Sequence, residues 1–436
     1  MKSFLRKILP YAFILWTHQL RALLAAVIFG FPARHVKVIG ITGTNGKTTT
    51  ANMVARILEE ANYKVGLATT INFKIGNKEW VNKTKMTTVS PFMLQKFMRD
   101  CVKANCHWVV LETTSHAIAQ YRNWSVNYDL AVLTNITHDH LDYHKTYEEY
   151  RNTKAKIFSR GKSINIINTD DKSFGYFRDL PAQRTITYGI ENPEKGRAER
   201  PEILAKKILL EAGGSLFTVV TPSGQIAIDL KLPGKFNIYN ALAAISVAYA
   251  MDIHLTLAKQ ALESIDNVPG RMEKVDLGQS FTVLVDYAHT PDALEKIYQT
   301  LDIAKRARII SVLGSCGDRD KSKRPILGAL AGKFADIVIV TNEDPYTEDP
   351  EKIIEEVSSG VPRGADSKKP KVLGENFFKL LDRREAIEKA IKMAYKDDIV
   401  LITGKGAEEC MVWGDKKLPW SDKKIAKEIL LNRMNG

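Results

Sequence analysis

The chain has 436 residues, which is too long for one ordinary domain, so two or three domains are expected. Its 63 Lys and Arg residues outnumber its 50 Asp and Glu residues, giving a formal net charge of +13. That excess suits an anionic substrate, nucleic acid or an anionic membrane surface, and it also suits lysines that simply keep a protein in solution. The four cysteines form no CxxC pair, which indicates neither a zinc ribbon nor a disulfide framework and favours the reducing cytoplasm.

Two apolar runs open the chain, at residues 8–16 and 22–31, and each is shorter than the roughly 20 residues that span a bilayer. Large apolar residues recur there at helical spacing: Trp16, Leu20, Leu24, Val27 and Phe31. The first interpretation is a helix packed on the body of the protein. The second is peripheral membrane contact through residues 1–31, helped by Lys2, Arg6 and Lys7. A cleaved signal peptide is the third, and the glycine-rich loop that follows almost at once disfavours it.

From Val36 onward, strand-like and helix-like stretches alternate, which is typical of an α/β fold with a mainly parallel sheet. Strands are expected at residues 36–42, 109–112 and 130–135, and helices at 48–60 and 237–251. Between residues 164 and 228, shorter and more polar strands indicate a β-rich insertion.

Turn residues at 268–270 indicate a domain boundary. Four buried strands are expected beyond it, at residues 281–285, 308–313, 337–340 and 399–402. A polar, glycine-bearing loop follows each, and open α/β sheets bind ligands at such strand ends. The predicted division is an N-terminal helical extension (1–35), a central domain (36–268) and a C-terminal domain (269–436).

The segment VIGITGTNGKTTT has the strand–loop–helix pattern of a phosphate-binding loop. Its candidate binding residues are Gly43, Thr44, Asn45, Gly46, Lys47, Thr48 and Thr49. Glycines let backbone N–H groups close around phosphate oxygens, and the helix N-terminus adds partial positive charge. Lys47 is suited to the β- and γ-phosphates and the Thr48 hydroxyl to Mg²⁺. Ile41 stands where the strict GxxxxGK[ST] pattern has its first glycine, so a glycine turn without nucleotide is the alternative to an ATP or GTP site.

A metal site is predicted near this loop. Glu112 ends a predicted strand, and the segment HDHLDYH supplies further candidates: His138, Asp139, His140, Asp142 and His144. The spacing of His140 and His144 would also suit zinc, whereas a phosphoryl-transfer site favours Mg²⁺. Exposed loop histidines are the alternative to either metal.

The phosphate loop resembles that of the Mur ligases, the peptide synthetases of bacterial cell-wall precursor assembly. Further segments match the family in order: MTTVSP, LETTSHAIAQYR, LTNITHDHLDYH, YRNTKAKIF, LPGKFNIYNALAA, VPGRME, VDYAHTPDAL, GSCGDRDKSKRP and ITGKGAEE. The resemblance covers roughly nine-tenths of the chain, from about Val36 to the C-terminus. It is closest to the branch that adds the third residue of the stem peptide, the UDP-N-acetylmuramoyl-tripeptide synthetases.

The resemblance implies a central P-loop ATPase domain with a parallel sheet and a C-terminal Rossmann-like domain. The implied enzyme uses ATP and Mg²⁺ to activate a muramoyl-peptide carboxylate as an acyl phosphate and joins it to an amino acid. The implied metal ligands are Thr48, Glu112 and His140, with a carbamylated Lys154 supporting a second Mg²⁺. Carbon dioxide attacks only a neutral amine, so burial that lowers the pKa of Lys154 would favour this modification. On sequence alone, Lys154 reads as a solvated helix lysine.

The same resemblance assigns nucleotide contacts to Asn237 and Asn240 and a ribose contact to Asp286. It also implies that Arg271 reaches the γ-phosphate when the C-terminal domain closes. Asn237 and Asn240 are three residues apart, so they lie on one face of a helix. Without the resemblance, the simpler interpretation is that they mark the start of that helix. The implied muramoyl-peptide contacts are Thr87, Thr88, Ser115, Gln120 and Arg122; an arginine there can clamp an anionic group bidentately.

For the incoming amino acid, the resemblance assigns the α-carboxylate to Arg319 and the side-chain end to Gly404 and Glu408. The chain reads Glu343-Asp344-Pro345-Tyr346 where diaminopimelate-adding members carry D-N-P-R. Tyr346 cannot form the arginine fork that grips a second carboxylate, and Asp344 with Glu408 would attract a cationic amine. We therefore expect lysine or a similar diamino acid.

A second departure concerns the uridine-binding N-terminal domain of the family, because only residues 1–35 precede the phosphate loop here. A UDP-linked, lipid-linked or shortened acceptor, or a partner that supplies the missing domain, all stay open. We expect a cytoplasmic monomer without a nucleic-acid partner. The alternatives are a folylpolyglutamate or poly-glutamate type of ligase, an amidotransferase-linked relative, which typically has a four-cysteine zinc module, and a non-catalytic nucleotide-binding regulator.

Overall fold

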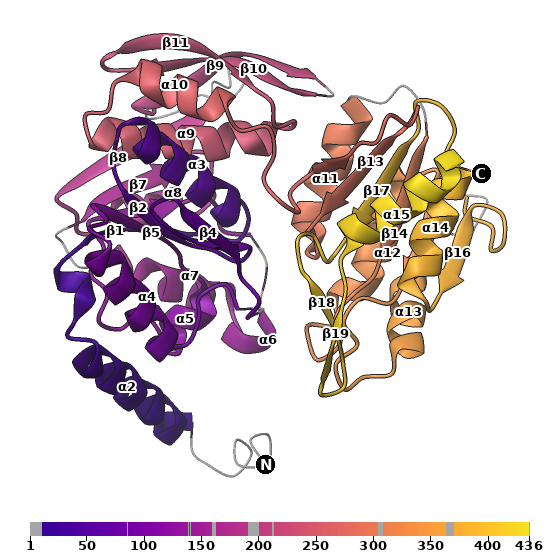
Figure 1. The fold of residues 1–436 in the computed structure, drawn as a ribbon, viewed down its shortest axis with the longest axis horizontal. Coiled ribbons are helices and arrows are strands. Elements are labelled where there is room, and N and C mark those ends of the chain that lie inside the picture. The colour runs from indigo at the N-terminus through magenta and orange to yellow at the C-terminus, as the bar shows by residue number, and fades with distance from the viewer. Residues whose placement is uncertain are drawn as a thin grey trace.

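The protein is organised around two large β-sheets, which Figure 1 shows side by side, with the indigo-to-pink part of the chain around one and the orange-to-yellow part around the other. The computed structural model describes residues 11–84, 86–137, 139, 141–158, 163–190, 200–211, 213–303, 308–362 and 370–435. Helices cover both sheets, so the predicted α/β fold is confirmed.

The first sheet has 11 strands in the order β11-β10-β9-β8-β7-β6-β1-β5-β2-β3-β4. The strand bounds are β1 Lys37–Thr42, β2 Val65–Ala68, β3 Asn72–Ile75, β4 Lys78–Val81, β5 Trp108–Glu112, β6 Leu130–Leu133, β7 Ile164–Asn168, β8 Arg184–Ile190, β9 Ile203–Glu211, β10 Gly214–Thr221 and β11 Gly224–Leu230. The strands from β2 to β9 along this order pair in parallel, and both edges are antiparallel. The predicted insertion between residues 164 and 228 is therefore wrong: its strands continue the central sheet.

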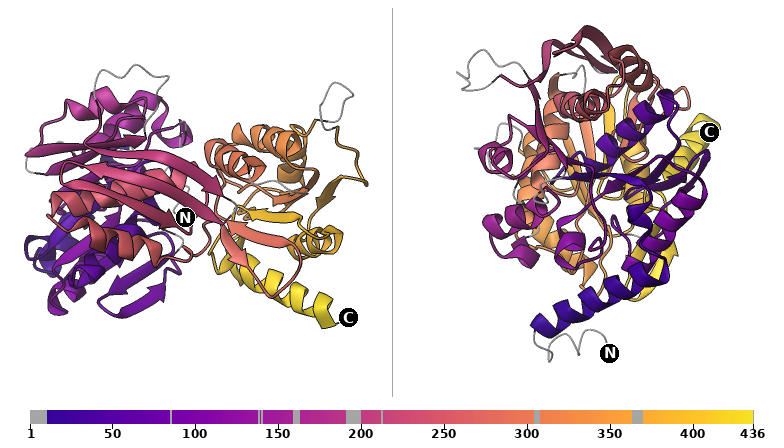
Figure 2. Two further views of the ribbon diagram at one scale, coloured as in Figure 1. Left: turned by 90° about the horizontal axis from the view of Figure 1, so that it is seen from above. Right: turned by 90° about the vertical axis from the view of Figure 1, so that its left-hand side faces the viewer.

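Helices cover both faces of this sheet (Figure 2). Their bounds are α2 Tyr11–Ile28, α3 Lys47–Glu60, α4 Pro91–Lys103, α5 Ser115–Ala119, α6 Leu141–His144, α7 Tyr147–Ala155, α8 Phe174–Arg178, α9 Lys235–Ala250 and α10 Leu255–Glu263, with a 3₁₀ turn η1 at Pro32–Arg34. Successive strand side chains point to opposite faces: Ile39 packs in the core under α3, α9 and α10, whereas Val38 packs in the core under α4 and α7. Burial on both faces explains why these strands are nearly continuous apolar runs.

The second sheet has the order β12-β13-β17-β14-β15-β16. Its strands are β12 Glu273–Val275, β13 Thr282–Asp286, β14 Ile309–Leu313, β15 Ile337–Thr341, β16 Phe377–Leu380 and β17 Ile399–Thr403; the hairpin β18 Cys410–Trp413 and β19 Lys416–Pro419 stands apart. The covering helices are α11 Pro291–Ile303, α12 Lys323–Phe334, α13 Pro350–Ser358, α14 Arg383–Met393 and α15 Asp422–Asn435. The four strands expected from the sequence are β13, β14, β15 and β17, which are neighbours in this parallel sheet.

Helix α2 packs against α4 through its small residues. Ala22, Ala25 and Ala26 are buried, whereas the large apolar residues at helical spacing lie on the exposed side. The sequence therefore predicted the helix and its packing on the body, but the stripe expected to carry the packing faces outward. No helix in the described ranges is both long and apolar enough to cross a membrane.

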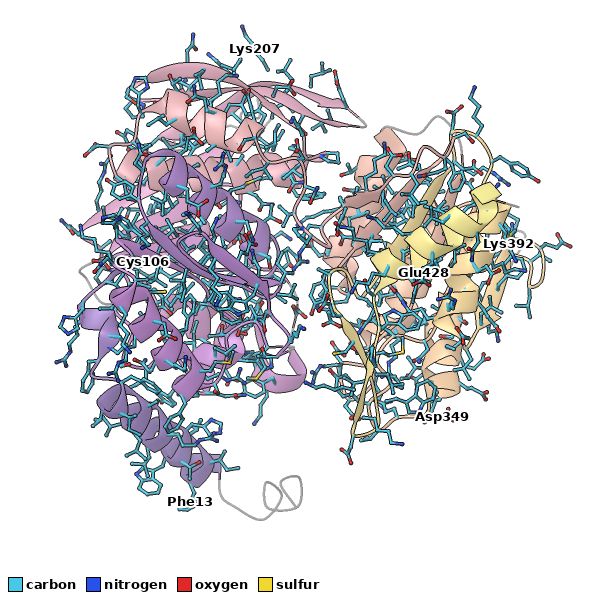
Figure 3. The ribbon with its side chains drawn as sticks, viewed as in Figure 1. Phe13, Cys106, Lys207, Asp349, Lys392 and Glu428 are labelled. Carbon is cyan, nitrogen blue, oxygen red and sulfur yellow. The ribbon has the colours of Figure 1, made fainter. Side chains whose placement is uncertain are left out.

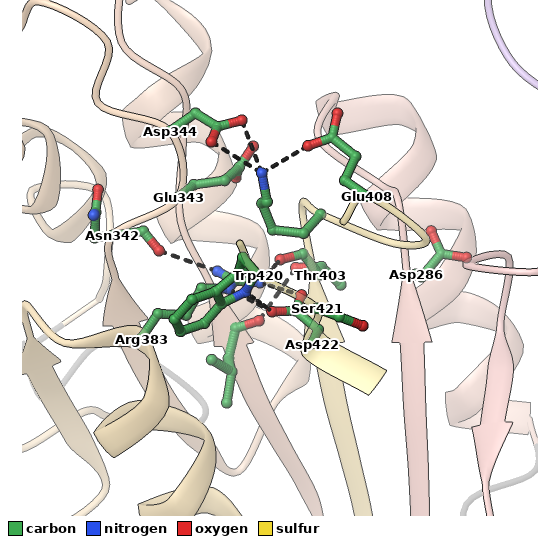
Figure 4. Close-up of polar contacts among 12 residues, drawn as sticks. Asp286, Asn342, Glu343, Asp344, Arg383, Thr403, Glu408, Trp420, Ser421 and Asp422 are labelled. Atoms are coloured by element: carbon green, nitrogen blue, oxygen red, sulfur yellow. Dashed lines mark hydrogen bonds and ion pairs between the residues drawn. The ribbon is translucent and has the colours of Figure 1, made fainter. Parts of the chain in front are cut away.

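A buried ion pair holds the strand ends of the second sheet together. Arg383 at the start of α14 donates to both carboxylate oxygens of Asp422 (2.9 and 2.7 Å), and both side chains are fully buried. The same guanidinium donates to the carbonyl oxygens of Asn342 and Thr403, which follow or end β15 and β17 (Figure 4). Arg383 thus fixes the two loops that lie nearest the C-terminal candidate site.

Replacing Asp422 should destabilise the C-terminal domain strongly. Asp422→Ala leaves the Arg383 guanidinium buried without a counter-charge, and we expect a loss of about 3–5 kcal/mol in the free energy of unfolding. Urea unfolding measures it. Glu428→Ala is the control, because it breaks a pair between Glu428 and Arg384 whose side chains are 57% and 46% exposed. This control should cost less than about 1 kcal/mol; equal losses in the two variants would contradict the role given to Arg383.

Candidate active site

The phosphate loop between β1 and α3 is shaped by close contacts with two other segments. The backbone N–H groups of Thr44 and Asn45 donate to the backbone and side-chain oxygens of Asn135, which follows β6 (2.7 and 3.0 Å). Gly46 has a φ of 84°, and a Cβ atom there would lie 2.2 Å from Oδ1 of Asn240. Only glycine combines this conformation with so close an approach. The loop is therefore fixed between the end of β6 and the first turns of α9.

Glu112 connects this loop to the neighbouring strand. It ends β5, is 3% exposed, and its Oε2 accepts hydrogen bonds from the Thr48 hydroxyl (2.9 Å) and from the backbone N–H and hydroxyl of Thr70 (2.8 and 3.0 Å). Thr70 follows β2, which is parallel to β5, so both residues lie at the same edge of the sheet. Thr70 was not predicted from the sequence, because the strand that it follows, β2, was not predicted either.

Two cations lie beside the Thr48 hydroxyl. Arg271 reaches it from the start of the C-terminal region, with Nη2 3.1 Å from Oγ1, and its guanidinium lies 4.6 Å from the centre of the Tyr287 ring. Lys47 donates to the carbonyl oxygen of Thr44 (2.7 Å). Burial lowers the pKa of Lys47, while the nearby Glu112 carboxylate opposes that shift.

Lys154 in α7 is buried, not solvated as the sequence alone suggested. It is 1% exposed, and its Nζ donates to the carbonyl oxygen of Gly43 in the phosphate loop (2.7 Å). The Tyr150 ring lies 4.6 Å from this nitrogen, and the Tyr150 hydroxyl is hydrogen-bonded to Thr44 (3.1 Å). Burial, and then the charge of Lys47, hold the pKa of Lys154 well below its usual value. This shift favours the neutral form of the amine, which is the form that carbon dioxide attacks.

The predicted metal ligands are only partly visible. His138 and His140 lie outside the described residues, and within the described ranges no three His, Cys, Asp or Glu side chains converge as a metal site. The oxygen atoms of Thr48 and Glu112 are the hard ligands that Mg²⁺ prefers. His144, which the zinc alternative needs, is buried beside the rings of Tyr143 and Tyr150, and burial lowers its pKa to about 4.

A cavity of about 1050 Å³ extends from the phosphate loop to the second sheet. Predicted nucleotide contacts line it: Asn45, Gly46, Thr48, Thr49, Asn237, Asn240, Arg271 and Asp286. The two halves also meet where Nδ2 of Asn45 donates to Asp292 of α11 (2.5 Å). Asp286 uses both carboxylate oxygens to accept backbone N–H groups of Met272 and Ala288 (2.7 and 2.6 Å), so it also shapes the loop after β13. Burial raises the pKa of Asp286, and the Arg271 charge opposes the shift.

The predicted muramoyl-peptide residues form a connected group beside Glu112. The hydroxyls of Thr70 and Thr87 are 2.9 Å apart, and the Thr88 hydroxyl donates to the Glu112 carbonyl oxygen (3.0 Å). Arg122 donates to the Thr88 carbonyl oxygen (2.7 Å) and through two nitrogens to Gln120 Oε1 (3.1 and 2.6 Å). The Ser115 hydroxyl, 1% exposed, has no hydrogen-bond partner. Such a buried polar atom is expected to be completed by a ligand or water.

In the C-terminal domain, Lys405 offsets part of the negative charge of the acidic pair predicted to attract the amino acid's amine. Its buried Nζ donates to both oxygens of Asp344 (2.9 and 2.9 Å) and to Glu408 (2.7 Å) (Figure 4). Gly404 packs so tightly that a Cβ would lie 2.3 Å from Glu343 Oε2. The sequence analysis missed Lys405, although it stands inside the GKGAEE segment, because spacing does not show which acid a lysine meets.

Arg319 lies on the exposed side of the same region. Its guanidinium is 5.3 Å from the centre of the Tyr346 ring. The arginine is therefore held by the aromatic ring that replaces the arginine of the D-N-P-R pattern. A second cavity, of about 680 Å³, has Glu408 in its wall together with Thr70 from the first sheet.

Both halves of the chain match known domain families. Residues 41–248 match the Mur ligase middle domain, and residues 270–406 match the Mur ligase, glutamate ligase domain. A UDP-N-acetylmuramoyl-L-alanyl-D-glutamate--2,6-diaminopimelate ligase of Geobacillus thermodenitrificans is 38% identical over 94% of this chain and 82% of its own length. A solved structure of an enzyme with that name has a TM-score of 0.62 at 29% identity, over 92% of this chain and 79% of that one. The structure of Mycobacterium tuberculosis folylpolyglutamate synthase complexed with ADP has a TM-score of 0.72 at 19% identity, over 94% of this chain and 93% of that one. This likeness shows a shared fold.

Removing the Thr70 hydroxyl should weaken the site without unfolding it. Thr70→Val deletes one hydrogen bond to Glu112 and leaves the carboxylate less firmly oriented. Changes to residues that orient a metal ligand typically lower metal affinity or activity about 10- to 100-fold. We therefore expect Thr70→Val to lower the apparent Mg²⁺ affinity, or the rate of ATP turnover, by about 10- to 100-fold. Thr221→Val, in the β10–β11 turn, removes a comparable partly buried hydroxyl and should leave turnover unchanged; equal behaviour of the two variants would contradict this role for Thr70.

Proposed function

Because the chain belongs to the Mur ligase family, we propose that it is the ATP-dependent ligase that adds a diamino acid to a muramoyl-peptide carboxylate in peptidoglycan precursor synthesis. The observation that carries the proposal is the meeting of Thr48, Glu112 and Arg271 at the large cavity, with the buried Lys154 bonded to the same phosphate loop. The phosphate loop, a buried carboxylate and a guanidinium therefore lie close together at one site.

The first step transfers the γ-phosphoryl group of ATP to the acceptor carboxylate. The phosphate loop holds the nucleotide, and Lys47 and Arg271 stabilise the negative charge that develops on the transferred group. Thr48 and Glu112, in the described part of the site, would hold Mg²⁺, which would supply positive charge next to the phosphates. The group around Arg122 and Ser115 holds the peptide so that its carboxylate points toward the cavity. By analogy with the relative's name, the reacting carboxylate is that of D-glutamate.

The second step forms the amide bond. The neutral amine of the incoming amino acid attacks the acyl phosphate, and inorganic phosphate leaves. Arg319 binds the α-carboxylate of this amino acid, while Gly404 and Glu408 shape the space for its side-chain end. Contact of both sheets with the cavity excludes water that would hydrolyse the acyl phosphate. Arg271 takes part only when the C-terminal domain lies against the phosphate loop, so domain closure controls the reaction.

The identity of the added amino acid depends on the region of Tyr346. The relatives act on diaminopimelate by name, whereas Tyr346 provides no second guanidinium for a second carboxylate. The charge argument from Asp344 and Glu408 is weaker than the sequence indicated, because Lys405 pairs with both and offsets part of their negative charge. The absence of the arginine fork at Tyr346 still favours lysine over diaminopimelate.

Acceptor-dependent phosphate release tests the proposed reaction. Purified protein, ATP and Mg²⁺ are combined with muramoyl-dipeptide in UDP-linked, lipid-linked and shortened forms, and with lysine, diaminopimelate or ornithine. Release that requires both an acceptor and an amino acid is expected, with lysine preferred. Tyr346→Arg should shift the ratio of kcat/KM values toward diaminopimelate by about 10- to 150-fold, since a bidentate guanidinium–carboxylate pair is worth roughly 1.5–3 kcal/mol. No acceptor-dependent release with any combination would refute the ligase.

The carbamate on Lys154 has a separate test. Lys154→Ala should lower turnover by at least about 100-fold, and added formate or acetate should restore part of it by placing a small carboxylate in the vacated space. Lys156→Ala is the matched control, because Lys156 is two residues away and exposed. It should retain activity. Intact-protein mass spectrometry in bicarbonate should show the added carbon dioxide on the wild type and on Lys156→Ala but not on Lys154→Ala; full activity of Lys154→Ala would exclude the modification as a requirement.

A further inference from the structure

Helix α2 is apolar on two opposite sides, and the protein covers only one of them. The side that packs on α4 carries the buried alanines Ala22, Ala25 and Ala26. The other side carries seven large residues: Phe13 (46% exposed), Trp16 (55%), Leu20 (39%), Leu23 (39%), Leu24 (45%), Val27 (57%) and Ile28 (58%). Their three- and four-residue intervals place them in one stripe, which we call the outer stripe.

The outer stripe is well placed to meet an extended surface. Helix α2 projects beyond the body of the first domain, with Phe13 near its free end (Figure 1, Figure 3). An 18-residue helix is about 27 Å long, so the stripe runs along most of that length. A contiguous apolar surface of this kind on a monomer usually marks an interaction site.

Along the sequence, every charged residue in and next to α2 is basic. The first acidic residue of the chain is Glu59. Before β1 is complete the sequence has these Lys and Arg residues: Lys2, Arg6, Lys7, Arg21, Arg34 and Lys37. Arg21 lies in α2 itself and is exposed. Apolar side chains with a tryptophan, flanked by basic residues and free of acidic ones, are typical of helices that lie in an anionic lipid interface.

We propose that the outer stripe of α2 docks the protein on the surface of an anionic membrane, with the helix lying in the plane of the interface. A second copy of the chain is a poorer occupant, because a twofold contact would bring the same basic residues together. Anionic headgroups neutralise those residues, while the large apolar side chains enter the boundary of the acyl chains. The alanine side keeps the first domain attached to the docked helix. This proposal is independent of the ligase reaction.

Vesicle flotation with the full chain tests this docking. Vesicles of phosphatidylcholine with phosphatidylglycerol are compared with vesicles of phosphatidylcholine alone, at low and high salt. We expect binding to the anionic vesicles, weakened by salt. The triple variant Leu20→Gln, Leu24→Gln and Val27→Gln should bind more than about tenfold more weakly. Arg21→Glu should bind roughly fivefold more weakly at low salt.

The matched control changes two leucines that are equally exposed elsewhere. Leu209→Gln with Leu216→Gln alters residues of β9 and β10 that are 52% and 43% exposed, and this variant should bind vesicles as the wild type does. Quenching of tryptophan fluorescence by brominated lipid should decrease in Trp16→Phe, since Trp16 enters the interface. Thermal unfolding and acceptor-dependent phosphate release without vesicles, measured on the same preparations, show that each variant is folded.

Three results would overturn the proposal. One is the absence of wild-type binding to anionic vesicles. Another is binding that the triple variant retains. The third is self-association of the wild type in sedimentation that the triple variant abolishes without any vesicle binding, which would make a second copy the occupant of the outer stripe.

Discussion

The buried carboxylate of Glu112 is the contact on which the candidate site depends. The Glu112 carboxylate is 3% exposed, so it needs hydrogen-bond donors. Thr48, which follows the phosphate loop, and Thr70, which follows β2, supply them. Parallel pairing of β1, β5 and β2 brings their ends to one edge of the sheet. The phosphate loop, the metal-binding oxygens and the group around Thr88 are therefore positioned by the same strand register.

The C-terminal domain contributes to this edge through a short, tightly packed junction. Gly270 has a φ of 64°, and a Cβ there would lie 2.1 Å from the backbone nitrogen of Ala407. The next residue, Arg271, extends from this junction to the Thr48 hydroxyl. Because the backbone at Gly270 packs directly on the loop after β17, a movement of the second sheet would also move Arg271. Arg271 therefore links the position of the second sheet to the phosphate loop.

The sequence predicted those parts of the molecule that depend on local pattern. Apolar runs predicted β1, β5, β13, β14, β15 and β17 because buried parallel strands are apolar on both faces. Pairing between distant strands was not predictable in this way, so β7 to β11 were mistaken for an insertion. Periodicity found α2 but could not tell which side faced the protein, because alanines can pack closely while larger residues stay outside. Lys405 shows the same limit: its partners Asp344 and Glu408 become neighbours only in the folded loops.

The charges around the phosphate loop give a physical reason why a buried lysine there is suited to become a negatively charged carbamate. Lys47 serves the nucleotide as a cation, and its charge also lowers the pKa of Lys154 beyond the effect of burial. Burial and the charge of Lys47 both lower the pKa of Lys154, which favours the neutral amine that carbon dioxide attacks. Once carbamylated, Lys154 would carry a negative charge beside Lys47, and the two groups would attract each other. Modification would then stabilise the site in which it occurs, which gives a physical reason for burying two lysines beside one loop.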